Sequence, residues 1–99
     1  MNTNKPAYCV EYFYAKTEHI EDLKTALASL VEPSRQEAQC LQYDLLQDKE
    51  NPSLFIIIVK FETEDAMQIH ESQTYVKDFA ENKMEKYCEK FFWNDASLI

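Results

Sequence analysis

The chain has 99 residues, of which 45% are hydrophobic and 13% aromatic, and this composition is typical of one globular domain over residues 1–99 rather than of a disordered segment. The formal net charge of −8 argues against nucleic acid as a partner, because an acidic protein repels phosphate backbones. Glycine is absent, which excludes the glycine-rich loops that bind nucleotide cofactors.

The first predicted element is a strand at residues 8–16, which are rich in aromatic and β-branched residues; the polar residues 1–6 before it are expected to be frayed. Glu11 interrupts an otherwise apolar face of this strand. Its side chain either points to the edge of the sheet, which we expect, or enters a cavity as a carboxylate. Because side chains alternate along a strand, one face should carry Tyr8, Val10, Tyr12 and Tyr14, and the other Cys9, Glu11, Phe13 and Ala15.

A helix is predicted next. Thr17 is a suitable N-cap, and acidic residues follow in the first turns, where the helix dipole favours them. Pro33 should end or kink this helix, because proline has no backbone N–H and disfavours helical geometry at the preceding residue. The apolar residues at helical spacing are Ile20, Leu23, Leu27, Leu30 and Val31.

Residues 40–47 and 54–62 are predicted to form a β-hairpin across a turn at residues 48–53. An antiparallel sheet in a small monomer usually has one polar face, but the second of these strands is apolar on both. We therefore expect helices to cover one face of the sheet and a second copy of the chain to cover the other. The apolar residues are Phe55, Ile57, Val59 and Phe61 on one face and Ile56 and Ile58 on the other.

The remaining elements complete the fold prediction. Thr63 is a second good N-cap, and apolar residues including Ile69 continue at helical spacing up to Met84, with a predicted break near residues 72–74. Aromatic residues at 87–94 predict a last strand. This order predicts an α+β, ferredoxin-like βαββαβ domain with a four-stranded antiparallel sheet, and two such sheets face to face would form a dimeric α+β barrel.

The cysteines Cys9, Cys40 and Cys88 are odd in number and lack metal-binding spacing, so we expect buried thiols in a reducing compartment, the cytoplasm. No metal site is expected, because the two histidines, His19 and His70, are far apart in the sequence. No apolar run is long enough to span a membrane, and the N-terminal residues lack the apolar segment of a signal peptide.

Residues 32–79 contain a set of spaced residues that matches the pattern of a known family. The set comprises Glu37, Cys40, Leu41, Tyr43, Gln47, Asp48, Phe55, Asp65, Ala66, His70, Tyr75 and Phe79. In this pattern the chain resembles the antibiotic biosynthesis monooxygenase family of small dimeric α+β barrel proteins. Three departures stand out: Ala38-Gln39 replaces a Pro-Gly pair, Val59 replaces a strand carboxylate, and Phe61 replaces a tryptophan.

The resemblance bears on two related activities. Haem-degrading relatives use an Asn on the first strand, a Trp on the third and a His on the second helix, and only His70 matches this set. A sister branch isomerises a phosphorylated autoinducer sugar, and its turn region and helical histidine resemble those of this chain.

His70 is the leading catalytic candidate. It lies beside the apolar stripe of the second predicted helix, and a histidine there can accept a proton from a phenol or enol, since histidine titrates near neutral pH. The alternative is a partly exposed histidine with no role in catalysis. The candidate substrate-binding residues are Tyr43 and Tyr75, as hydrogen-bond donors, and Phe61, Phe79 and Trp93, as an aromatic wall, although aromatic residues also fill cores.

The sequence is compatible with three functions. The first is a monooxygenase that oxidises a small phenol- or quinol-like molecule without metal, flavin or other cofactor. The second is an isomerase of a phosphorylated, sugar-derived carbonyl compound, for which only Lys60, Arg35 and Lys77 could supply positive charge. The third is a ligand-binding relative without catalysis, which the changes at Val59 and Phe61 favour.

Overall fold

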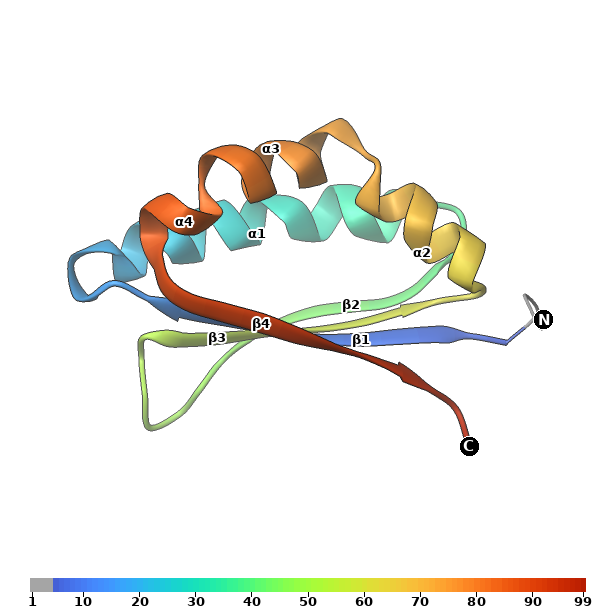
Figure 1. Ribbon diagram of the computed structural model, residues 1–99, viewed down its shortest axis with the longest axis horizontal. Helices are drawn as coiled ribbons and strands as arrows, with labels where there is room; N and C mark the ends of the chain where they lie inside the picture. The colour runs from blue at the N-terminus through green and yellow to red at the C-terminus, as the bar shows by residue number, and fades with distance from the viewer. Residues whose placement is uncertain (1–4) are drawn as a thin grey trace.

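The computed structural model describes residues 5–99, in which helices cover one face of an antiparallel sheet (Figure 1). In chain order the elements are β1 (Ala7–Ala15), the 3-10 turn η1 (Thr17–His19), α1 (Ile20–Gln36), β2 (Cys40–Gln47), β3 (Leu54–Phe61), α2 (Glu64–Glu71), α3 (Thr74–Asn82), α4 (Met84–Tyr87) and β4 (Cys88–Ser97). The strands lie in the order β2-β3-β1-β4, so β1 and β3 are central. This arrangement confirms the predicted ferredoxin-like βαββαβ fold.

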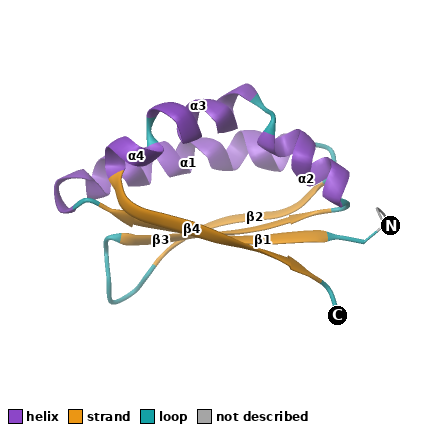
Figure 2. Cartoon of the chain, viewed as in Figure 1, coloured by secondary structure: helices purple, strands orange, loops and turns teal. Residues whose placement is uncertain are grey.

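The core lies between the sheet and the helix layer (Figure 2). The inward face of β3 is buried throughout, as its apolar pattern predicts, and it packs with the apolar stripe of α1. Burying one such side chain stabilises the folded state by about 1.5–3 kcal/mol. The most completely buried large side chains are Phe55, Ile57, Val59 and Phe61 on β3 and Leu23 and Leu27 on α1.

In the described part of the chain, residues 5–99, no helix covers the opposite face of the sheet (Figure 1). Strand alternation and the pairing register place a continuous apolar surface there. Within it, the rings of Tyr12 and Phe92 stack with their centroids 4.8 Å apart. We call this surface the open face and define it by Val10, Tyr12, Leu46, Ile56, Ile58 and Phe92.

The expected position of Glu11 at a sheet edge is wrong, and so is a helix end at Pro33. Glu11 does not point to a sheet edge, because β1 is a central strand and Glu11 lies on its helix-covered face. Pro33 does not end the first helix, because α1 continues to Gln36. Contacts outside the helix hold its last turn: Ser34 is fully buried, and Arg35 Nε donates a hydrogen bond to the Tyr43 carbonyl oxygen at 2.9 Å.

The other boundaries follow the sequence closely. The predicted break in the second helix is confirmed, since α2 ends at Glu71 and α3 begins at Thr74. The last strand begins at Cys88, after the short helix α4, and extends to Ser97. Residues 1–4 lie outside the described part of the chain, and Lys5 and Pro6 precede β1. Among residues 5–99, no helix is both long and apolar enough to cross a membrane.

The two threonines predicted as N-caps differ. Thr63 Oγ1 accepts a hydrogen bond from the backbone N–H of Ala66 at 3.1 Å and so caps α2. Thr17 instead opens η1, and α1 begins at Ile20 without a side-chain cap. The first backbone N–H groups of a helix need hydrogen-bond acceptors from outside the helix. Of the two threonines, only Thr63 supplies such an acceptor.

We predict that Thr63→Ala lowers the free energy of unfolding by about 1 kcal/mol, because the cap hydrogen bond is lost. Thr17→Ala is the matched control and should change it by less than about 0.5 kcal/mol, since its hydroxyl caps no helix. Urea denaturation of both variants measures the difference. An equal effect of the two substitutions would contradict the capping role of Thr63.

Candidate functional site

A cavity of about 350 Å³ lies between the sheet and the helices, and we call it the inner cavity. Its aromatic lining comes from Phe13 on β1, Phe79 on α3 and Trp93 on β4. A second hollow of about 270 Å³ lies beside it, toward the end of the molecule that carries α2, and we call it the outer hollow. The polar residues that line the inner cavity are Cys9, Glu11, Tyr43, His70, Glu71 and Asp95.

His70 reaches the inner cavity from the last turn of α2. The Thr63 cap starts this helix so that Ala66, Met67 and His70 face inward, and His70 is only 6% exposed. Its ring lies against Phe61 and Tyr43, with centroid distances of 5.0 and 5.6 Å.

The structure therefore buries His70 deeper than the partly exposed position that the sequence also allowed. By contrast, Ile69 was predicted on the apolar stripe but is 59% exposed. The inward face of this short helix is set by its neighbours Ala66, Met67 and His70 instead.

A carboxylate orients His70. Glu37 follows the end of α1, and its Oε2 lies 2.9 Å from His70 Nδ1. Tyr75 Oη, from α3, donates a hydrogen bond to the same carboxylate oxygen. This oxygen therefore links the ends of α1, α2 and α3 above the sheet.

The hydrogen-bond network assigns the tautomer of His70. In the neutral form of His70, the Glu37 acceptor favours the tautomer with the proton on Nδ1, which leaves the lone pair on Nε2. Nε2 has no hydrogen-bond partner among residues 5–99, and the side chain lines the inner cavity. A neutral imidazole held in this way by a carboxylate can act as a general base.

The two candidate tyrosines are both uncharged donors at neutral pH. Burial, followed by the hydrogen bond to Glu37, raises the pKa of Tyr75 to about 12. Burial also raises the pKa of Tyr43 above its ordinary value of 10.0. Of the pair, Tyr43 lines the inner cavity and Tyr75 lies behind His70.

The structure brings most of the sequence candidates together. His70, Tyr43, Phe79 and Trp93 line the inner cavity, with Trp93 at its rim and 57% exposed. Phe61 and Tyr75 contact His70 without lining the cavity.

Several residues were not among the sequence candidates for the site, and besides Glu71 and Asp95 in the cavity lining they include Glu37 and Ser34. Glu37 matched the family pattern, but its partnership with His70 spans 33 positions of the sequence and has no local signal. Ser34 has a fully buried hydroxyl without a hydrogen-bond partner among the described residues. A serine in the last turn of a helix gives no sequence signal that its side chain is buried.

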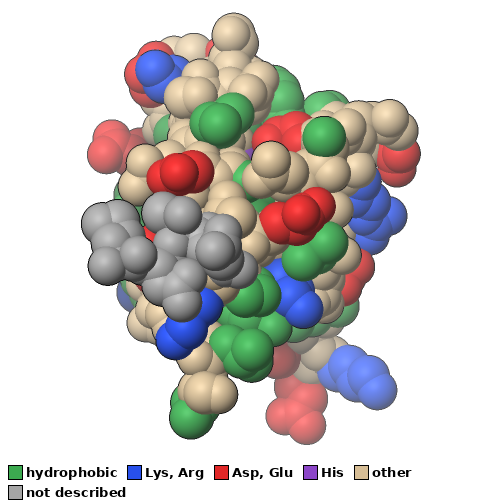
Figure 3. All heavy atoms as spheres, turned by 90° about the vertical axis from the view of Figure 1, so that its right-hand side faces the viewer, with side chains coloured by type: hydrophobic (Ala, Val, Ile, Leu, Met, Phe, Trp, Pro, Cys, Tyr) green, Lys and Arg blue, Asp and Glu red, His purple; other side chains and the backbone are tan. Residues whose placement is uncertain are grey.

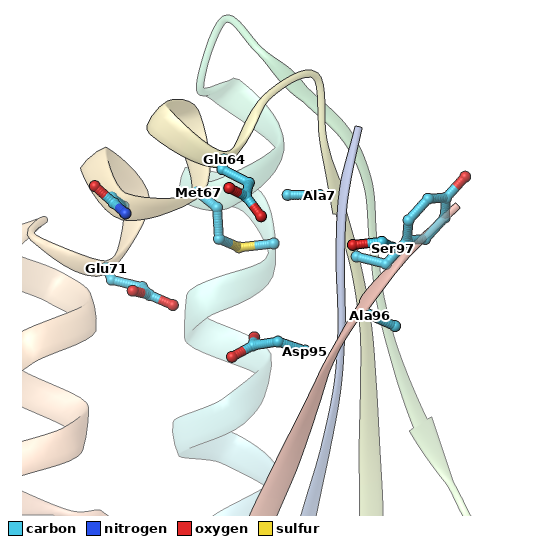
Figure 4. A pocket seen from close by; sticks show the side chains of 9 residues that line it. Ala7, Glu64, Met67, Glu71, Asp95, Ala96 and Ser97 are labelled. Carbon is cyan, nitrogen blue, oxygen red and sulfur yellow. The ribbon is translucent and has the colours of Figure 1, made fainter. Parts of the chain in front are cut away.

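The polar side of the inner cavity is acidic. Glu71 and Asp95 line both this cavity and the outer hollow, and Figure 4 shows their side chains extending into the space between α2 and the strands. Figure 3, which looks onto this end of the molecule, shows further acidic side chains around it. Burial, together with repulsion from Glu71 and Asp95, raises the pKa of Glu11 to about 7.

No lysine or arginine lines the inner cavity. Lys60 lies instead over the ring of Tyr8, 5.2 Å from its centroid, and Arg35 Nη2 lies 3.1 Å from Asp44 Oδ1. Lys77 is exposed on α3. Within residues 5–99, no group of three or more histidine, cysteine or acidic side chains is arranged to hold a metal ion.

We predict that Glu11→Gln makes the protein more stable than the wild type at about pH 8, by about 1–3 kcal/mol. The folded-state pKa of Glu11 is about 7 and its ordinary value is 4.5, so the folded state binds this proton more tightly than the unfolded state does. Ionisation therefore costs stability as the pH rises from about 4.5 to about 7.

The difference between Glu11→Gln and the wild type should accordingly shrink toward zero as the pH falls to about 4. Urea denaturation across this range measures it, with the exposed Glu21→Gln as a control of equal charge change. A difference that stays constant with pH would contradict the raised pKa.

Solved structures similar to this chain share the whole fold. Protein SO0527 from Shewanella oneidensis is 26% identical, with a TM-score of 0.93, over 96% of this chain and 92% of that one. PA3566 from Pseudomonas aeruginosa is 28% identical, with a TM-score of 0.90, over 100% and 99% of the two chains. No protein with a curated description matches the chain.

A further solved structure, described as an antibiotic biosynthesis monooxygenase, is 22% identical with a TM-score of 0.85 over 94% of this chain and 98% of that one, a likeness that shows the fold. The family model described as antibiotic biosynthesis monooxygenase matches residues 6–82. This range includes β1, α1, α2 and α3, and the hydrogen-bonded residues Glu37, His70 and Tyr75. The chain belongs to the antibiotic biosynthesis monooxygenase family.

Proposed function

We propose that the protein is a monooxygenase that oxidises a small phenol- or quinol-like molecule with dioxygen and without a bound cofactor. The observation that carries this proposal is the His70–Glu37 pair, which presents an unpartnered Nε2 to a cavity lined by aromatic side chains. A phenol fits such a cavity, because its ring packs against Phe79 and Trp93 while its hydroxyl reaches the base.

The proposed reaction begins with transfer of the phenol proton to His70 Nε2. The phenolate electron pair then forms a bond to dioxygen from an ortho or para ring carbon that carries hydrogen. The resulting peroxide takes up the proton held by Nε2, which frees Nε2 again. Loss of the proton on that carbon breaks the O–O bond, and the departing hydroxide takes up a second proton to become water. The products are a quinone and water, and two protons leave the substrate while two return to oxygen.

The other proposed roles follow from this geometry. Tyr43, a neutral donor on the cavity wall, hydrogen-bonds the substrate oxygen, and Tyr75 holds Glu37 in place. Phe61 packs against the His70 ring and limits its rotation. Exclusion of water by the aromatic lining protects the peroxide from side reactions.

We further propose that two copies of this single domain pair through the open face as a homodimer. An apolar surface of this kind is costly to expose to water, and it matches itself across a two-fold axis. The free thiols Cys9, Cys40 and Cys88 support a reducing, cytoplasmic location for this assembly.

The alternative of an isomerase for a phosphorylated sugar-derived substrate is less well supported. A phosphate needs cations or a helix N-terminus, and the inner cavity has three carboxyl groups and no lysine or arginine in its lining. A relative without catalysis would keep the cavity, and its distinguishing property would be binding of hydroquinones without consumption of oxygen.

We predict that His70→Ala lowers kcat for oxygen uptake by about 10²–10⁴-fold, because the general base is lost. Oxygen consumption is measured with a panel of hydroquinones and hydroxynaphthalenes that the wild type turns over. His70→Gln preserves more of the buried volume and tests whether a loss reflects chemistry rather than folding. His19→Ala, outside the cavity, is the matched control, and unchanged turnover in both His70 variants would remove this residue from the mechanism.

We predict that Ile58→Asp on the open face converts a dimer into a monomer, because it places a charge in the apolar contact. Ile69→Asp, at an exposed position in the helix layer, should leave the dimer intact. Sedimentation velocity at micromolar concentration distinguishes these states. A wild-type protein that sediments as a monomer would contradict the homodimer.

A further inference from the structure

The carboxyl group of Glu11, a half-buried side chain, has no role in the mechanism above. Glu11 lies on the central strand β1, between Ile57 on β3 and Trp93 on β4, with its side chain in the inner cavity. It makes no hydrogen bond or ion pair among residues 5–99. Placing an unpartnered carboxyl group in the middle of a sheet costs stability, and such groups concentrate at functional sites.

The surroundings of Glu11 favour its protonated form. Glu71 and Asp95 face it from α2 and β4, and together with burial they raise its pKa to about 7. The remaining ionisable groups in the cavity are Cys9, Tyr43 and His70, and none of them is a lysine or arginine that would stabilise the carboxylate. At neutral pH a substantial share of Glu11 therefore carries a proton.

Besides the carboxyl groups, the cavity has a thiol and a phenol that are weaker acids than Glu11. Burial raises the pKa of both the Cys9 thiol and the Tyr43 hydroxyl well above neutrality. A group that both holds and releases a proton near neutral pH transfers it most effectively. Among these three, Glu11 alone satisfies that condition.

We propose that Glu11 is the general acid of the inner cavity, which delivers one proton to the leaving oxygen while His70 removes the proton of the ring carbon. This inference rests on the proposed function. In the step that breaks the O–O bond, the ring carbon loses its proton to Nε2, the carbonyl forms, and the leaving oxygen takes the Glu11 proton as it departs. The products are the quinone, water, a protonated His70 and the Glu11 carboxylate.

The same geometry supplies a route by which the Glu11 carboxylate regains its proton. Glu71 and Asp95 line both the inner cavity and the outer hollow, so a proton can pass between the two spaces along these carboxyl groups, whose side chains Figure 4 shows. A proton released by His70 to solvent after each turnover is balanced by one taken up through these groups. Net proton transfer over the cycle is then zero, as the overall reaction requires.

The test compares Glu11→Gln with the wild type in oxygen-uptake assays with a hydroquinone that the wild type oxidises. Glutamine keeps the size and polarity of the side chain but delivers no proton. We expect kcat to fall by at least about tenfold, with KM changed by less than about threefold. Glu11→Asp should recover part of the loss, and the exposed Glu21→Gln should behave like the wild type.

The pH profile adds a signature that a structural role would not produce. In the wild type, kcat should fall as the pH rises above about 7, since the acid must be protonated, and this limb should be absent from the residual rate of Glu11→Gln. Binding of hydroquinone, read from the fluorescence of Trp93, the only tryptophan in the chain, shows whether the cavity of the variant is intact.

The outcomes separate this inference from the proposed function. Wild-type protein that consumes no oxygen with any quinol overturns both. Wild-type turnover with an unchanged kcat in Glu11→Gln overturns the role of Glu11 alone, as does a raised KM at constant kcat, which would make Glu11 a binding residue. Persistence of the alkaline limb in Glu11→Gln would assign that limb to another group and also overturn the inference.

Discussion

The alternation of side chains along the two central strands is the constraint on which the rest of the molecule depends. On β3 every inward residue from Phe55 to Phe61 is apolar and buried, and this row anchors α1 to the sheet. On β1 the inward row is Cys9, Glu11 and Phe13, so a carboxyl group interrupts the apolar layer. The core extends over both central strands, and Glu11 lines the inner cavity between the core residues Cys9 and Phe13.

A single carboxylate oxygen organises the helix layer above that cavity. Glu37 stands at the end of α1, and it receives Tyr75 from α3 and Nδ1 of His70 from α2. Three segments that lie far apart in the sequence are thereby tied together, and the imidazole is fixed with Nε2 toward the cavity. A hydrogen-bonded carboxylate of this kind sets both the tautomer and the orientation of a histidine base.

The electrostatic character of the cavity narrows the ligands that it accepts. Glu11, Glu71 and Asp95 approach one another from β1, α2 and β4, and no cation in the lining compensates them. Anionic molecules such as sugar phosphates would meet repulsion, whereas a neutral phenol would not.

Much of the fold was predictable from the sequence, because strand and helix periods are local properties of the chain. The element order, both faces of β1 and β3, the Thr63 cap and the break before Thr74 all follow from residue patterns within a few positions. The errors arose where tertiary contacts override local preference. Pro33 stays inside α1 because Ser34 and Arg35 are held from outside the helix.

The candidate site was predictable only in part, for the same physical reason. His70 and its aromatic neighbours could be proposed from helical position and family pattern, and the structure places them around one cavity. The contact of Glu37 with His70 and the inward position of Glu11 depend on strand order and on how α1 and α2 end. Sequence alone determined which side chains share a face of an element; only the tertiary structure decided which faces meet, because pairings between distant segments are set by the packing of the whole chain.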